Sequence, residues 1–342
     1  MRIVKQLSFG MLALATSFTF AGSILAQEAE EPHEHYGTTA YSLAPDLSVQ
    51  PETVPIFKPS LIVSKASYAT GGTSLRNRGA GNINISGLVG APTHAYIYWG
   101  VITSGTPPTA AKSIKLQRLF PTESIVEYLN GVAIGKGVAP CWGPSGAIIT
   151  IFRAEIPLSV ASGNGSYEIS LHAGASGLTN GADPWVGTPV LPLWEGASMV
   201  LIGSGTGTVS VFDSGLAGNT FIAYPSAEYI LDLPVKAPGV KTLFDNIGAD
   251  GQHGDSYLAE RSYSDEVTTI NGHLVAGPGS SYTDSDWNGS SGYPLPQLWD
   301  DTGHNITNST PKDTSSLTVE ITVEAASSYD CLTTVANVVD EQ

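Results

Sequence analysis

The chain has 342 residues, of which 31 are acidic and 15 basic, so its formal net charge at pH 7 is −16. Such an acidic surface repels phosphate backbones, which excludes nucleic acid as an expected partner and favours divalent cations, although solubility alone also explains the charge. Thirty-eight glycines and 22 prolines interrupt short apolar runs, and no window of a dozen residues carries a helical stripe, which disfavours an α/β enzyme.

The first 26 residues have the pattern of a secretory signal peptide. Arg2 and Lys5 precede an apolar run that ends in small residues at Ala26, where we expect cleavage. The run is too short to span a membrane, and no later apolar stretch reaches about 18 residues, so we expect no transmembrane anchor. Cleavage removes both basic residues and leaves 13 against 31 acidic ones, a net charge of −18. We expect bacterial export, to the extracellular space or the cell surface.

Residues 27–60 are rich in acidic residues, proline and threonine, and they predict a flexible leader or linker. Residues 61–342 predict an all-β domain, a β-sandwich or jelly-roll-like fold that is rich in glycine and turns. Residues 315–325, SSLTVEITVEA, form the clearest strand because apolar and polar residues alternate. Residues 94–102 and 146–156 are apolar on both faces and predict inner strands. Prolines and a glycine in 234–240 mark a possible sub-boundary.

Three segments predict β-hairpins. Asn130-Gly131 and Asn271-Gly272 each lie between two strand-like runs, and these residues tolerate the positive φ angles of a type I′ turn. The segment MVLIGSGTGTVSVF, residues 199–212, predicts two strands joined through a Gly/Ser/Thr loop.

Two cysteines, Cys141 and Cys331, remain in the exported chain. A disulfide between them is the expected state in an oxidising compartment. The loop-entropy model predicts that a disulfide closing such a long loop stabilises the folded state by roughly 5 kcal/mol. Two buried free thiols are the alternative.

Acidic loops suggest a calcium site. LFDNIGADGQHGDSY spaces Asp245, Asp250 and Asp255 with glycines. YTDSDWNGSSGY contains the beginning of an EF-hand loop at Asp284, but the twelfth position counted from Asp284 is Leu295 rather than glutamate. Aspartate, asparagine and glycine are also ordinary turn residues, which is the alternative. The candidate calcium ligands are Asp250, Asp255, Asp284, Asp286, Asn288, Asp300 and Asp301.

Trp287 and Trp299 lie among these acidic residues and are candidates for stacking on a sugar ring, with burial against a loop as the alternative. The sequence lacks the nucleophile elbow, the zinc-protease helix motif, the phosphate-binding loop and the dinucleotide fingerprint, so no catalysis is expected. A glycoside hydrolase remains a lesser alternative because two carboxylates far apart in sequence leave no local mark.

The order of these segments resembles an uncharacterised module of secreted bacterial and archaeal surface proteins, which often precedes conserved-repeat domains. The resemblance covers roughly residues 61–339 and is best around Trp99, Gly196–Val200, Asp250–Gln252 and Asp330–Leu332. It implies a β-sandwich at the cell surface, without catalytic residues to transfer. No repeat, sorting signal or anchor follows the module here, so free secretion or non-covalent attachment is expected.

Together these observations predict a secreted structural or adhesive protein of the cell surface or extracellular matrix, with calcium as a candidate stabilising ion. Its expected partners are surface or matrix components, glycans or further copies of itself. A carbohydrate-binding module that uses Trp287 or Trp299 is the alternative from a different class.

Overall fold

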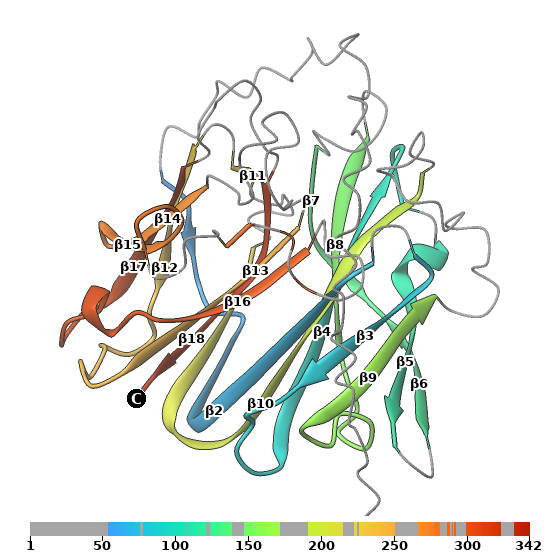
Figure 1. The fold of residues 1–342 in the computed structure, drawn as a ribbon, viewed down its shortest axis with the longest axis horizontal. Coiled ribbons are helices and arrows are strands. Elements are labelled where there is room, and N and C mark those ends of the chain that lie inside the picture. The colour runs from blue at the N-terminus through green and yellow to red at the C-terminus, as the bar shows by residue number, and fades with distance from the viewer. Residues whose placement is uncertain are drawn as a thin grey trace, which may run out of the picture. The chain divides into compact units, whose positions relative to one another are not determined.

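The computed structural model describes residues 54–75, 78–107, 109–120, 124–138, 147–171, 191–214, 222–223, 226–249, 266–280, 286–287, 289, 291, 299–322 and 332–342. Within these residues the regular structure is β-strand apart from two short 3₁₀ helices, η2 (Thr109–Lys112) and η3 (Thr307–Ser309) (Figure 1). The strands form multi-stranded sheets that pack face to face, so the prediction of an all-β, sandwich-like fold is confirmed.

The described strands form three sheets. Sheet A has the order β1 (Ile56–Phe57), β12 (Ser226–Asp232), β17 (Ser316–Thr322), β14 (Val267–Ile270) and β15 (His273–Ala276). Sheet B has the order β16 (Trp299–Asn305), β13 (Thr242–Ala249), β18 (Leu332–Glu341), β10 (Leu193–Asp213), β4 (Pro92–Thr103), β8 (Ile148–Glu155) and β7 (Val132–Val138); β2 (Leu61–Ser74) also pairs with β10, and β11 (Ile222–Ala223) with β18. Sheet C has the order β3 (Ala80–Ile85), β9 (Gly165–Leu171), β5 (Ser113–Leu119) and β6 (Ile125–Asn130).

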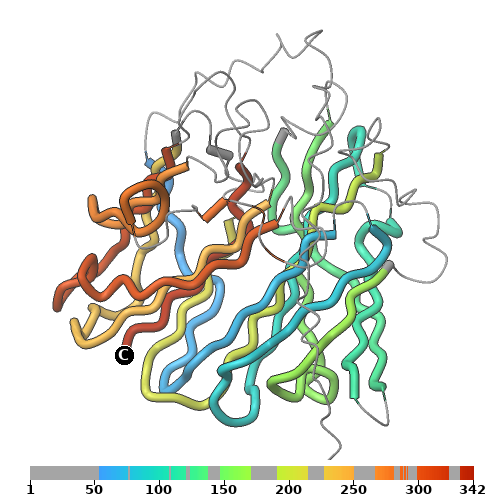
Figure 2. The backbone as a smooth tube through the Cα atoms, in the orientation of Figure 1, coloured from blue at the N-terminus to red at the C-terminus, as the bar shows by residue number. Residues whose placement is uncertain are grey.

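Sheet B changes direction where β2 and β10 bend together. β2 pairs with β10 along both lengths, but the register shifts between Ser204 and Thr208, and Lys65 on β2 has a positive φ of 55°. Figure 2 shows the two strands turning side by side. Before the bend β10 pairs with β4, and after it with β18. We call the part with β4, β8 and β7 arm 1, and the part with β18, β13 and β16 arm 2.

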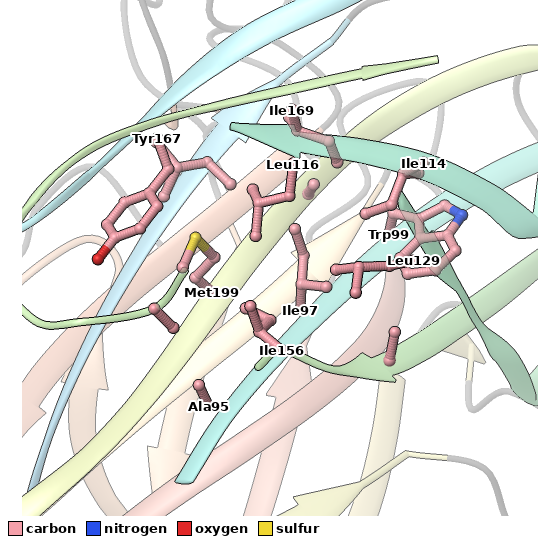
Figure 3. Packing of buried hydrophobic residues seen from close by; sticks show 14 of the residues in the cluster. Ala95, Ile97, Trp99, Ile114, Leu116, Leu129, Ile156, Tyr167, Ile169 and Met199 are labelled. Carbon is pink, nitrogen blue, oxygen red and sulfur yellow. The ribbon is translucent and has the colours of Figure 1, made fainter. Parts of the chain in front are cut away.

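Three apolar clusters fill the spaces between these layers. The first lies between sheet C and arm 1, the second between the two arms, and the third between arm 2 and sheet A. Figure 3 shows the first cluster, where side chains of the two layers interdigitate: Ile97, Trp99 and Met199 from arm 1 and Ile114, Leu116, Leu129, Tyr167 and Ile169 from sheet C. Burial of each large apolar side chain contributes about 1.5–3 kcal/mol, so these clusters hold the layers together.

The structure corrects the start of the β domain. The leader was predicted to reach residue 60, yet residues 54–60 are described and β1 pairs in parallel with β12. Phe57 is buried in the third cluster, with its ring against Tyr229 at a centroid distance of 5.5 Å. The burial of Phe57 and the pairing of β1 with β12 dock this segment on the domain.

One of the three hairpin predictions is confirmed. Asn271 and Gly272 have φ angles of 51° and 74° and connect β14 to β15, as a type I′ turn requires. Asn130-Gly131 instead carries the chain from β6 in sheet C to β7 in sheet B. Residues 199–212 lie in the bent strand β10, whose halves pair with different strands.

The predicted inner strands and the alternating strand are confirmed. β4 lies between β10 and β8, and on β17 the residues Leu317, Val319 and Ile321 are buried. The possible sub-boundary at 234–240 is a connection from β12 in sheet A to β13 in sheet B, and residues 36–342 cluster as one compact unit.

Candidate functional site

Acidic side chains gather on β13 and β16, the outer strands of arm 2. β16 runs antiparallel to β13, with Asp301 opposite Ile247 and Asp300 opposite Gly248. Successive residues of a strand point to opposite faces, and residues directly opposite each other on neighbouring strands share a face. Asp301 therefore faces arm 1, together with Ile247 and Asp245, whereas Asp300 faces sheet A.

Asp245 and Asp301 form what we call the carboxyl pair. Both carboxyl groups lie within hydrogen-bonding distance of each other and of Thr70 on β2. The Thr70 hydroxyl donates to Asp245 Oδ2 at 2.8 Å. Ser198 on β10 accepts a hydrogen bond from Trp299 Nε1 at 2.9 Å, which leaves its own hydroxyl proton for Asp301. Two carboxyl groups and two hydroxyl groups thus meet between the arms.

Burial shifts the pKa of both members of the pair upward. Desolvation, followed by the negative charge of Asp301, raises the pKa of Asp245. Desolvation raises the pKa of Asp301 to about 6, although hydrogen bonds from Ser198 and Thr70 oppose the shift. The same carboxylates and Asp340 add to desolvation in raising the pKa of the Tyr68 phenol. The region disfavours negative charge unless a proton or a cation balances it.

A separate polar group lies on the opposite face of arm 2. The imidazole Nε2 of His304 lies 2.5 Å from Asp286 Oδ1, and both side chains are buried. Trp287 packs on the same face, because a Cβ at Gly248 would lie 2.2 Å from its ring. Asp286 and Asp300 therefore lie on the other face of the sheet from Asp301.

The remaining calcium candidates, Asp250, Asp255, Asp284 and Asn288, lie outside the described residues, as do Cys141 and Cys331. In the part of the chain that the structure describes, no group of three or more His, Cys, Asp or Glu side chains could hold a metal ion. Any cation near the carboxyl pair would need other oxygen ligands as well.

The prediction that Trp287 or Trp299 offers an exposed ring for sugar stacking is wrong. Both side chains are 0% exposed. Trp299 lies across arm 1, where a Cβ at Gly196 would be 2.4 Å from its Cγ. The loop positions suggested accessibility, but the indoles fill the space that glycines leave on the facing strands.

Replacing Gly196 with alanine is expected to lower the free energy of unfolding by about 1–3 kcal/mol, because the added methyl group must displace Trp299 or the backbone. Thermal or urea unfolding measures the change. Gly79→Ala is the matched control, since nothing lies within 4 Å of a Cβ at Gly79. If Gly196→Ala and Gly79→Ala were equally stable, the packing of Trp299 against Gly196 would be contradicted.

The sequence pattern missed Thr70, Ser198, Tyr68 and His304. Each is an isolated polar or amphipathic residue on a strand, and the strands come from distant parts of the chain. Ser198, inside the apolar run ASMVLIG, is the one whose surroundings hinted at a buried polar role.

The carboxyl pair does not match the glycosidase alternative. Retaining glycosidases hold their carboxyl groups about 5 Å apart across a substrate, and inverting enzymes hold them farther apart. Asp245 and Asp301 lie beside each other, and Thr70, Ser198 and Trp299 cover them. No substrate bond fits between them.

No protein-family model and no curated protein matches the chain. The site must therefore be interpreted from its own geometry.

Proposed function

We propose that the protein is a non-catalytic structural or adhesive component outside the bacterial cell, at the cell surface or in the extracellular matrix, and that it assembles through the edge of sheet C. A signal-peptide pattern at residues 1–26 supports export. Among the described residues, no helix has the length and apolar character needed to cross a membrane.

The observation that carries this proposal is an apolar sheet edge. β6 ends sheet C, and no described strand pairs with its outer side. Of the 14 large apolar side chains exposed in the described residues, six lie between residues 119 and 132. We call them the edge patch: Leu119, Phe120, Ile125, Val126, Tyr128 and Val132.

Within its described residues, β6 has no proline, no lysine and no bulge. Soluble proteins protect such edges with proline, lysine, bulges or a covering loop. β6 reads IVEYLN, its register against β5 is regular, and its single charged residue is Glu127. An edge of this kind can take an additional strand, with backbone hydrogen bonds providing affinity and side chains providing selectivity.

The segments at this edge carry a local positive charge, which helps an acidic chain to approach another copy of itself. Residues 109–120 contain Lys112, Lys115 and Arg118, and residues 124–138 contain Lys136 against Glu127. These described segments carry a net charge of +3, counted as four basic residues and one acidic residue, in a chain of net charge −16. This positive charge attracts the acidic remainder of a second copy.

Lysine substitutions in the edge patch are expected to prevent this assembly. Val126→Lys and Tyr128→Lys place a charge beside the open edge, where pairing would bury it. The wild-type chain without its signal peptide should increase in mass with concentration in light scattering, and each variant should raise the dissociation constant roughly tenfold or more.

Val240→Lys is the matched control. Val240 is 76% exposed and lies on the connection between β12 and β13, away from the edge patch. It should assemble like the wild type. A wild-type chain that stays monomeric at all concentrations, or assembly equally weakened by all three variants, would contradict the proposal.

A further inference from the structure

We propose that the carboxyl pair, Asp245 with Asp301, binds a divalent cation of the calcium type between the two arms of sheet B. This site is distinct from the edge patch and does not depend on the proposed assembly. It also differs from the acidic-loop site that the sequence suggested, because Asp245 and Asp301 come from paired strands and their other partners from β2 and β10.

Two oxygen atoms of the pair point to a missing positive charge. Asp245 is 5% exposed, and its Oδ1 is buried and has no hydrogen-bond partner. The Oδ2 atom of Asp301 is also buried and has no hydrogen-bond partner. The ion pairs among the described residues are Lys58 with Asp232, Arg153 with Asp213 and His304 with Asp286, so none neutralises this site. A buried carboxylate oxygen without a donor is costly, and the pair has two of them.

A shared proton satisfies this geometry less well than a cation does. One proton bridges one pair of oxygens and leaves a net charge of −1, whereas a divalent ion can contact both orphan oxygens and balance both charges. Thr70 already donates to Asp245 Oδ2, and Ser198 is oriented toward Asp301 by the hydrogen bond it accepts from Trp299. The hydroxyl groups thus hold one side of each carboxylate and leave the other side for the ion.

Two glycines pack closely against the pair and its neighbours. A Cβ at Gly72 on β2 would lie 2.8 Å from Ser198 Oγ, 2.9 Å from Asp301 Cβ and 3.1 Å from Ser291 Oγ. A Cβ at Gly303 on β16 would lie 3.2 Å from Asp245 Oδ2. An ordinary side chain at either position would close on the carboxylates or their neighbours.

The ligand chemistry selects the class of cation. The side-chain ligands are carboxylate and hydroxyl oxygens, without nitrogen or sulfur, and such a set suits calcium rather than zinc or copper. Two carboxylates with two neighbouring hydroxyl groups supply part of the six to eight oxygens that calcium takes, and water supplies the rest.

Terbium luminescence tests the site directly. Terbium replaces calcium at oxygen sites, and the Trp299 indole, one hydrogen bond beyond Ser198, is placed to transfer excitation to it. Titration of the chelator-treated full chain with terbium should give saturable luminescence that calcium displaces. The same protein should melt roughly 5 °C higher or more when calcium is 100 times its dissociation constant.

The variant Asp245→Asn/Asp301→Asn should lose both signals. Its fold is expected to persist in chelator, because two buried charges have been removed, and circular dichroism checks this. Glu320→Gln, which removes an exposed carboxylate on β17, is the control and should behave as wild type. A wild-type melting temperature that calcium leaves unchanged would overturn the proposal in favour of a shared proton. A calcium response that survives in the double variant would place the ion elsewhere and also overturn it.

Discussion

Replacing Trp99 with alanine is expected to lower the free energy of unfolding by about 3–5 kcal/mol. The Trp99 side chain is fully buried between arm 1 and sheet C, and its ring stacks on Phe152 at a centroid distance of 5.5 Å. Its Nε1 donates to the carbonyl of Ala111 at 3.0 Å. Truncation therefore leaves a cavity in the first cluster and an unsatisfied buried carbonyl. Chemical unfolding followed by circular dichroism measures the loss.

Trp99→Phe separates these contributions, because it retains an aromatic ring against Phe152 but removes the donor to Ala111. Its loss of stability should be intermediate. The cost in Trp99→Ala is a large fraction of the 5–15 kcal/mol by which domains are usually stable, so partial unfolding at growth temperature is expected. If Trp99→Ala unfolded within 0.5 kcal/mol of the wild type, the packing of sheet C on arm 1 would be contradicted.

In the presence of a chelator, the free energy of unfolding is expected to fall as pH rises from about 4 to about 7. The pKa of Asp301 is raised by burial to about 6 in the folded chain, above its ordinary value of 3.8. The folded state therefore binds this proton more tightly than the unfolded state does. The resulting stabilisation is complete below about pH 4 and is lost as pH rises through about 6. A shift of about two pKa units corresponds to about 3 kcal/mol.

Two further groups act in the same direction. Burial and then the charge of Asp340 raise the pKa of Glu341 to about 7, and burial raises the pKa of Asp340. Both lie on β18 at its C-terminal end and are buried, so the stabilisation that each contributes is also lost as pH rises through its raised pKa. Asp245, whose pKa is raised in the same way, titrates together with Asp301.

Urea unfolding at several pH values in chelator measures this dependence. Asp301→Asn should flatten the curve between pH 4 and 7, since asparagine cannot bind the proton. Saturating calcium should flatten it as well, because the ion then holds the carboxylates ionised. Equal slopes for the wild type and Asp301→Asn would show that the carboxyl pair is not buried as described.

The sequence was sufficient to predict the strands but not their stacking. Alternation at Leu317, Val319 and Ile321 and the turn residues Asn271-Gly272 are local signals, and both predictions were confirmed. Asn130-Gly131 carries the same turn signal and was misread as a hairpin. Gly131 is required for a different reason, because a Cβ there would lie 2.3 Å from the Trp99 ring. The requirement for glycine comes from Trp99, which is distant from Gly131 in the sequence.

The candidate site shows the same limit. Asp301 was selected from its acidic surroundings, but its neighbour Asp300 was grouped with it although strand alternation sends the two to opposite faces. Asp245 meets Asp301 because β13 pairs with β16, and Thr70 and Ser198 join them because β2 and β10 bend together. The pairing of β13 with β16 joins residues 50 or more positions apart, and that of β2 with β10 joins residues more than a hundred apart, so neither leaves a local pattern to recognise.

Hydrogen exchange of the wild-type chain at low and high protein concentration tests the proposed assembly most directly. The backbone amides of β6 lie at the edge of sheet C, so a second chain that pairs there must slow their exchange. The protection of residues 125–130 from hydrogen exchange should increase with protein concentration, and Tyr128→Lys should abolish this increase. An increase in mass with concentration that leaves the exchange of residues 125–130 unchanged would contradict the proposed assembly.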